Sequence, residues 1–136
     1  MSTETTRTND VLAVMLAFDA ACEANDVDRV MEFFADDAVV TLLPPPAPDP
    51  GIYRGKQQIR SSQEQLLQHF HAVIRNREVA SDRVTWEATV WSDFFRRMGL
   101  ASVEDTIEAV VHDGKITSFT VTIAPESVRQ MEAAML

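Results

Sequence analysis

The stretch VEDTIEAVVHDGKITSFTVTI, Val103 to Ile123, does most to decide the fold class of this chain. Apolar and polar residues alternate on both sides of His112-Asp113-Gly114. An Asp-Gly pair between two alternating runs is a strong signal for a tight hairpin turn. The stretch therefore predicts two long antiparallel strands, over residues 103–112 and 114–123.

A second hairpin is predicted immediately upstream, with strands over residues 77–80 and 83–93. Trp86 and Trp91 have opposite parity in the longer strand, so their side chains lie on opposite faces of the sheet. The face of Trp86 is the more continuously apolar one and is expected to face the interior. Trp91 is expected on the convex side, in a protein–protein interface, where aromatic residues are enriched.

The first half of the chain has helical rather than strand periodicity. Apolar residues recur at helical spacing over residues 11–22, and a shorter helix follows with Asp26 as its expected N-cap. A strand is predicted over residues 38–43 and a third helix over residues 56–74, with His69 and His71 at the margins of its apolar stripe. A closing helix is predicted from Pro125.

This order predicts an α+β fold in which three N-terminal helices pack on one face of a curved antiparallel sheet. The length of 136 residues corresponds to a single domain, over residues 9–136, preceded by a polar, flexible leader over residues 1–8. There is no internal repeat and no linker.

Composition excludes several classes of function. The formal net charge of −9 disfavours nucleic acid as a partner. Cys22 is the single cysteine, so no intrachain disulfide forms, and its place in a helical apolar stripe predicts a core residue. The chain begins without a signal-peptide pattern and lacks an apolar run long enough to span a membrane. A cytoplasmic protein without a membrane partner is expected.

Five of the six prolines lie between Phe34 and Arg60. Because proline fixes φ and removes a backbone donor, the segment 44–50 is predicted to be a loop between strand and helix. It either narrows the mouth of a pocket as a stiff rim or simply connects the two elements.

The order of elements resembles the nuclear transport factor 2-like superfamily, which includes ketosteroid isomerases, limonene epoxide hydrolases and polyketide cyclases. The resemblance rests on ANDVDRVMEFFADDAVV (24–40), on Tyr53-Arg54-Gly55 before the third helix, and on AVVHDGKITSF (109–119). It implies a cone-shaped fold, a deep pocket capped by helices and dimerisation through the outer face of the sheet. It does not imply one function, since this fold hosts enzymes and binding proteins alike.

The catalytic residues of two of these groups are largely missing here. Ketosteroid isomerases have an aspartate base where this chain has Leu42 and a tyrosine where it has Phe18. Their protonated acid aligns with Glu108 when residues are counted back from Gly114. The positions that match the limonene epoxide hydrolase triad hold Glu87, Thr89 and Val121.

Glu108 is therefore the candidate catalytic residue, with three readings open. Alternation alone buries the row that contains Ile107 and Val111 and exposes Glu108. The family alignment instead places Glu108 in the pocket and the Ile107/Val111 row at a dimer interface. Inside an apolar pocket its pKa would rise, and the acid could donate a proton to an enolate-like oxygen. It could equally be a structural hydrogen-bonding group.

The resemblance and the strand parity together predict which residues surround a bound small molecule. Tyr53 either borders the pocket or packs against the third helix. No histidine pair has metal-ligand spacing, and four glycines do not form a phosphate-binding loop, so neither a metal nor a cofactor is expected. The predicted substrate-binding residues are Phe18, Leu42, Tyr53, Trp86, Val90 and Phe119.

Three functions remain open from the sequence. The first is a pocket protein that binds an apolar, cyclic or polyketide-like molecule. The second is an acid–base isomerase, lyase or cyclase that uses Glu108. The third is a structural or assembly module with a filled cone. In each case a homodimer is expected, through Trp91 and the Ile107/Val111 row.

Overall fold

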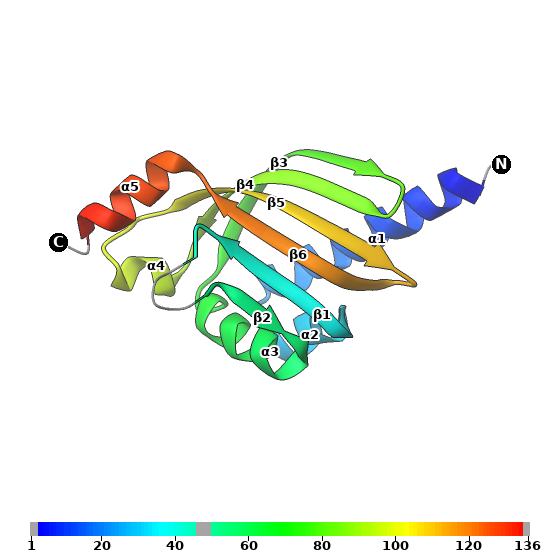
Figure 1. Ribbon diagram of the computed structural model, residues 1–136, viewed down its shortest axis with the longest axis horizontal. Coiled ribbons are helices and arrows are strands. Elements are labelled where there is room, and N and C mark those ends of the chain that lie inside the picture. The colour runs from blue at the N-terminus through cyan, green and yellow to red at the C-terminus, as the bar shows by residue number, and fades with distance from the viewer. Residues whose placement is uncertain (1–2, 46–49, 135–136) are drawn as a thin grey trace.

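The computed structural model describes residues 3–45 and 50–134 and shows an α+β architecture (Figure 1). The elements follow in the order α1 (Thr3–Glu23), α2 (Val27–Glu32), β1 (Phe34–Leu43), β2 (Ile52–Arg54), α3 (Gly55–Leu66), β3 (His71–Ala80), β4 (Arg83–Trp91), α4 (Asp93–Arg97), β5 (Val103–His112), β6 (Lys115–Ile123) and α5 (Pro125–Ala134).

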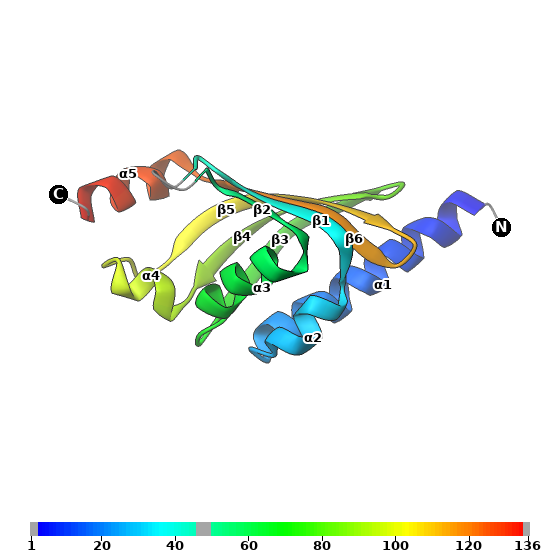
Figure 2. The same cartoon turned by 60° about the horizontal axis from the view of Figure 1, so that its bottom comes forward.

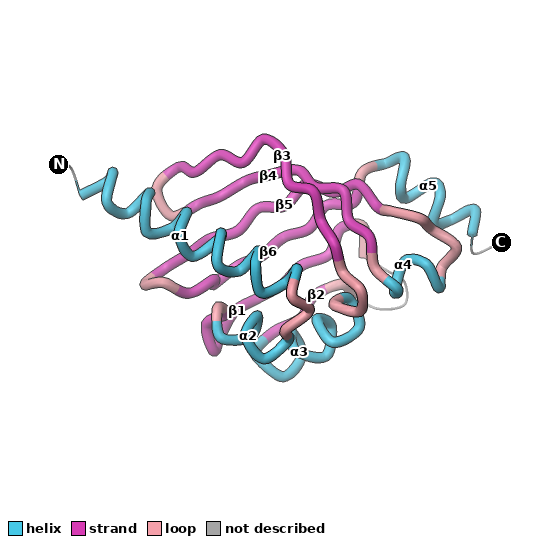
Figure 3. Tube along the Cα trace, turned by 180° about the vertical axis from the view of Figure 1, so that it is seen from behind, coloured by secondary structure: helices cyan, strands magenta, loops and turns pink. Residues whose placement is uncertain are grey.

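The strands form one curved, six-stranded sheet in the order β2-β1-β6-β5-β4-β3. Helices α1, α2, α3 and α4 lie on one side of this sheet, and α5 extends from its end (Figure 2). Seen from the helical side, α1 crosses the concave face while α2 and α3 lie beside it (Figure 3). The predicted fold class is confirmed. Four of the five strand pairings are antiparallel, and the fifth, between β1 and β6, is parallel.

The hairpin that set the fold class lies within one residue of its predicted bounds. Strand β5 ends at His112, and β6 begins at Lys115. Asp113 and Gly114 both have positive φ, at 49° and 76°, as the two central residues of a type I′ turn require. The ladder between these strands contains an irregularity at Val110/Val111, where β6 has one extra residue, Thr117, while β5 keeps its alternation.

Several predicted boundaries differ from the structure. Helix α1 begins at Thr3, inside the segment expected to be a leader. Helix α3 ends at Leu66, so Ile74 belongs to strand β3 rather than to a helix. His69 lies in the intervening loop with a φ of 53°, and His71 begins β3 opposite Trp91. Pairing with β4 converts this segment into strand, which local helical periodicity does not reveal.

The core lies between the concave face of the sheet and the helices. On α1 the residues Met15, Phe18 and Cys22 are buried, as their spacing predicts. On β5 the residues Ile107 and Val111 are 4% and 3% exposed and belong to the same core. Their predicted place on a convex interface is therefore wrong. Simple alternation describes this strand correctly, because its apolar row is the row that the helices cover.

Strand β3 contains a bulge that changes which way its side chains face. Between the pairs Arg75–Glu87 and Glu78–Thr85, the two residues Asn76 and Arg77 lie opposite the single residue Trp86 of β4, and Asn76 has a φ of 56°. One extra residue in a strand reverses the alternation beyond it. Arg75 therefore contacts Thr89 and Glu104 on the outer side, while Arg77 contacts Asp19 of α1 on the inner side.

Candidate functional site

A cavity of ≈ 1410 Å³ lies between the concave face of the sheet and the helices. Its walls come from α1, α3, α4 and α5 and from the inner residues of the strands, and are mostly apolar. All six side chains that the sequence predicts around a small molecule line it: Phe18, Leu42, Tyr53, Trp86, Val90 and Phe119. Their role in binding remains a prediction.

Aromatic side chains close one part of this cavity. Phe119 lies 5.6 Å from Phe18 and 5.9 Å from Trp86 between ring centroids, and Phe34 contacts both phenylalanines edge to face. Such packing gives a rigid wall, since tilted and edge-to-face pairs are favourable arrangements of aromatic rings. A ring-containing ligand would find matching apolar surfaces here.

Asp105 is the acidic residue that strand β5 directs into this cavity. It pairs with Ala88 of β4 and Ile123 of β6, and its strand neighbours on the same face are Val103 and Ile107. Its Oδ1 atom is buried and has no hydrogen-bond partner among the described residues. A buried polar atom without a partner is uncommon in folded proteins, and such atoms concentrate at functional positions.

Burial raises the pKa of Asp105 to about 7, and the nearby charge of Glu104 adds to this rise while Arg75 opposes it. Glu104 lies on the opposite face of the sheet, where it accepts hydrogen bonds from Thr89 and Arg75 at 2.7 Å and 2.8 Å. The hydrogen bond from Thr89 lowers the pKa of Glu104. Asp105 is consequently divided between its charged and neutral forms near neutral pH, as a group that both accepts and donates protons requires.

Glu108, the candidate from the sequence, lies on the other side of the sheet. It is half-exposed, forms an ion pair with Arg83, and borders a small outer depression with Thr85 and Thr120. Of the three readings of Glu108, the one that places it in the pocket is wrong: it is three positions from Asp105, and alternation puts the two side chains on opposite faces. The reading from alternation alone, which puts Glu108 on the outer side, agrees with the structure.

A signal for Asp105 was present in the sequence. It is the one carboxylate in the otherwise apolar row formed by Val103, Ile107, Ala109 and Val111. A carboxylate in a row that is predicted to be buried is informative, because burial of an unpaired carboxylate costs free energy and such residues are rarely buried.

A second polar group borders the cavity. Asp19 of α1 lines it and accepts two hydrogen bonds from the guanidinium of Arg77, at 2.5 Å and 3.2 Å. The carbon Cζ of that guanidinium lies 4.5 Å from the centre of the Trp86 ring. Burial raises the pKa of Asp19, and the Arg77 guanidinium opposes this rise. Both side chains are mostly buried, at 12% exposure for Arg77 and 21% for Asp19.

The sequence model of the SnoaL-like domain family matches residues 15–119. This chain belongs to the SnoaL-like domain family. No curated protein matches it in sequence. The match covers α1 through most of β6 and therefore includes every element that lines the cavity except α5.

Solved structures share this fold at low sequence identity. An NTF2-like protein of unknown function from Mesorhizobium loti has a TM-score of 0.72 and 21% identity, over 87% of this chain and 93% of its own. A putative ketosteroid isomerase from Kribbella flavida has a TM-score of 0.70 and 10% identity, over 86% and 79%. A putative polyketide cyclase from Sinorhizobium meliloti has a TM-score of 0.62 and 21% identity, over 80% and 93%.

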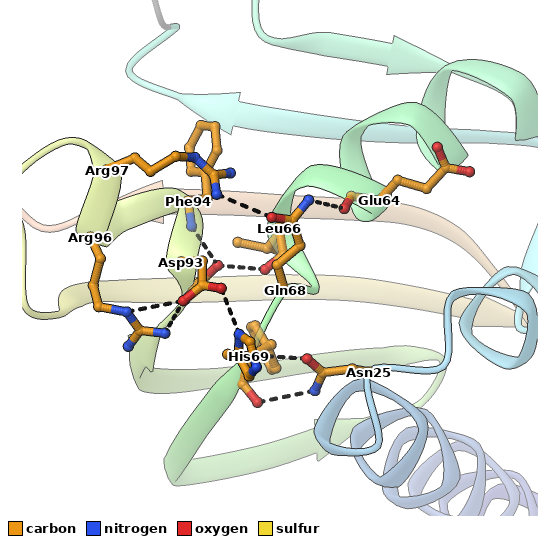
Figure 4. A network of polar contacts seen from close by, with 11 residues as sticks. Asn25, Glu64, Leu66, Gln68, His69, Asp93, Phe94, Arg96 and Arg97 are labelled. Atoms are coloured by element: carbon orange, nitrogen blue, oxygen red, sulfur yellow. Dashed lines mark hydrogen bonds and ion pairs between the residues drawn. The ribbon is translucent and has the colours of Figure 1, made fainter.

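Helix α4 of this SnoaL-like domain lies beside the end of α3 (Figure 4), and its residues Phe94 and Phe95 line the cavity. Ser92 Oγ donates to the carbonyl of Leu66 at 2.6 Å and accepts from the amide of Phe94 at 3.2 Å. It thereby caps α4 and joins it to α3. Next to it, Asp93 contacts Nδ1 of His69 at 2.6 Å, and this contact together with Arg96 lowers the pKa of Asp93.

The proline-rich segment also reaches the cavity of the SnoaL-like domain. Pro44, Pro45 and Pro50 line it, while residues 46–49 lie outside the described residues. Gly51 anchors the end of the segment, with a φ of 72° and a carbonyl that accepts from the amide of Leu42 at 2.7 Å. These contacts put the flanks of the segment at the cavity, and its role as a rim stays a prediction.

Within the described part of the chain, no three His, Cys, Asp or Glu side chains cluster as metal ligands would. No helix among residues 3–45 and 50–134 combines the length and apolar character that a membrane crossing needs. Among the side chains that line the cavity, Asp105 is the group poised to exchange protons near neutral pH.

Proposed function

We propose that this SnoaL-like protein is a cofactor-independent acid–base enzyme acting on an apolar, ring-containing small molecule. Asp105 carries the proposal, as a carboxyl with a pKa of about 7 and an unpartnered oxygen in an apolar cavity. The charged form would remove a proton from a carbon next to a carbonyl. The neutral form would return that proton at another position, so the net reaction is an isomerisation or a ring closure.

The surroundings of Asp105 support this chemistry. An apolar cavity excludes water from the reacting carbon and keeps the carboxyl from being fully charged. The putative ketosteroid isomerase and the putative polyketide cyclase that share this fold act, by their names, on such ring systems. They support the substrate class by analogy of fold.

The second candidate is a binding protein without chemistry. It is favoured by the apolar side chains at Phe18 and Leu42, the positions where ketosteroid isomerases carry a tyrosine and an aspartate base. Under this candidate the cavity would bind the same kind of molecule, and Asp105 would donate a hydrogen bond to it.

Proton exchange into 2-tetralone separates the two candidates without knowledge of the natural substrate. This bicyclic ketone has acidic protons next to its carbonyl, and their replacement by deuterium in D₂O is followed by proton NMR. The enzyme candidate predicts exchange above the buffer rate, and Asp105→Asn should lower it by roughly 10²–10⁴-fold. The matched control is Glu108→Gln, on the outer face of the same strand. This variant should catalyse deuterium exchange into 2-tetralone at the wild-type rate.

Two results would count against the enzyme candidate. One is binding of 2-tetralone, seen in quenching of tryptophan fluorescence, with exchange no faster than in buffer; this result favours the binding protein. The other is equal exchange by the wild type and Asp105→Asn. A mass-spectrometric search for small molecules retained by the purified protein then identifies the natural ligand.

A further inference from the structure

We propose that the Asp19–Arg77 pair is a second polar subsite of this cavity, which recognises a neutral hydroxyl group on the apolar ligand. The proposal rests on the proposed function, because it concerns the same cavity, and it adds a specificity-determining group. Asp105 would meet the reacting end of the ligand. The pair would meet a hydroxyl at the far end.

The position of the pair supports a role in binding. Asp19 lines the cavity, and so does Trp86, the ring on which the Arg77 guanidinium lies. The bulge at Asn76 turns Arg77 inward, whereas an unbroken strand would place it on the outer face with Arg75. A local break in the strand thus directs a charged side chain at the cavity wall, and bulges often re-aim side chains next to functional sites.

The hydrogen-bonding capacity of the pair indicates which group it would bind. Two N–H groups of Arg77 donate to the two oxygens of Asp19, and each carboxylate oxygen keeps a further lone pair. Nε of Arg77 is buried and has no hydrogen-bond partner among the described residues. Asp19, which lines the cavity, therefore offers free acceptors to a ligand, and a hydroxyl group can donate to them.

The charges of the pair also favour a neutral ligand group over a charged one. Its net charge is zero, so a ligand carboxylate would be repelled by Asp19 and a ligand ammonium by Arg77. A neutral hydroxyl meets neither penalty and gains hydrogen bonds to charged partners, which are stronger than neutral ones.

Distance suggests the size of the ligand. Trp86 pairs with Ile107, and Ala88 pairs with Asp105, so Trp86 and Asp105 differ by one strand and two residues. Strand geometry then places their Cα atoms about 8 Å apart. A fused ring system of two or more rings spans this separation, and the aromatic wall of Phe18, Phe119 and Trp86 lies along it.

A purely structural role explains the pair less well. Glu23, one turn later on α1, already joins this helix to β3 through the amide of Ala72 and the ring of His71. That contact is exposed and avoids the desolvation cost of a buried ion pair. The buried Asp19–Arg77 pair costs desolvation free energy, and it connects α1 with β3, two elements that Glu23 already joins.

The first test uses the wild-type protein alone. Three probes differ at one position: 6-hydroxy-2-tetralone, 6-methoxy-2-tetralone and 2-tetralone, each titrated against tryptophan fluorescence. The hydroxyl probe should bind about tenfold more tightly than the other two, because it alone donates to Asp19. Equal affinity of the hydroxyl and methoxy probes would overturn the proposal.

The second test replaces the pair by a neutral one of similar shape, Asp19→Asn with Arg77→Gln. The preference for the hydroxyl probe over 2-tetralone should disappear, while 2-tetralone itself keeps its affinity. The matched control is Arg83→Gln with Glu108→Gln, an ion pair of the same charges on the outer face, which should retain the preference. Because the preference is a ratio between two probes on one protein, a lower fraction of folded protein does not change it.

The outcomes separate this proposal from the proposed function. Binding of all three probes with no hydroxyl preference overturns the subsite and leaves the acid–base function standing. A preference that survives in the Asp19→Asn/Arg77→Gln variant also overturns it. Failure of every probe to bind the wild type overturns the apolar-ligand function and the subsite together.

Discussion

At the scale of single residues, the buried position of Asp105 lowers the stability of the folded protein at neutral pH. Its side chain lies in an apolar row, and the folded state favours its neutral form with a pKa of about 7, against an ordinary value of 3.8. The proton is therefore held more tightly in the folded than in the unfolded chain. By linkage, the folded state loses stability as pH rises from about 4 to about 7, and the loss is complete above that range.

Replacement of Asp105 by Asn should remove this pH dependence. Each tenfold change in acidity is worth about 1.4 kcal/mol, so the free energy of unfolding of Asp105→Asn should rise relative to wild type by roughly 3–4 kcal/mol from pH 4 to pH 8. Asp19, whose pKa burial also raises, is present in both proteins and cancels in the difference. Urea unfolding at a series of pH values measures this, and a difference constant with pH would contradict the buried position.

At the scale of elements, short polar contacts place α4 against the rest of the cavity wall. Ser92 is fully buried and supplies both the cap of α4 and the hydrogen bond to the last residue of α3. Phe94 and Phe95 of the same helix line the cavity. One hydroxyl group thus supplies two of the contacts that hold this wall, beside those of Asp93 with Gln68 and His69.

Ser92→Ala should lower the free energy of unfolding by about 1–3 kcal/mol, because it removes the cap and leaves the carbonyl of Leu66 without that donor. Ser61→Ala, at an exposed position of α3, is the control and should stay within about 0.5 kcal/mol of wild type. Thermal or urea melts compare the two. A Ser92→Ala variant as stable as the control would show that the contact contributes little.

At the scale of the whole molecule, the helices cover one face of the sheet and leave the other uncovered (Figure 2). The uncovered face carries many threonines, together with Trp91 of β4 and exposed Val73 and Leu43. We propose that a second copy of the chain covers this face in a homodimer. The Ile107/Val111 row takes no part, since it faces the core.

The proposal predicts a species of twice the chain mass of 15.2 kDa in sedimentation equilibrium at micromolar concentration. Trp91→Glu should shift the distribution toward monomer, because it brings an unpaired charge into the interface. Gln65→Glu, on an exposed part of α3, adds the same charge on the helical side and should leave the dimer unchanged. A wild-type protein that sediments as a monomer would rule the homodimer out.

The sequence by itself determined the features that depend on neighbouring residues. Alternation and the Asp-Gly turn were sufficient for β5 and β6, and Asp26 caps α2 by accepting from the amide of Arg29, as predicted. Parity alone also placed Trp86 inside. These signals are local, since a turn, a cap or the face of a strand is set by residues a few positions apart.

Only the tertiary structure decided the features that depend on distant pairing. The parallel contact of β1 with β6, the end of α3 at Leu66 and the bulge at Asn76 all follow from which strands lie side by side. One irregular residue in a ladder reverses the faces of all that follow. The bulge in β3 thereby brings Arg77 to Asp19 at the wall of the cavity that Asp105 also lines, whereas alignment by counting from Gly114 selected Glu108 on the outer face of β5.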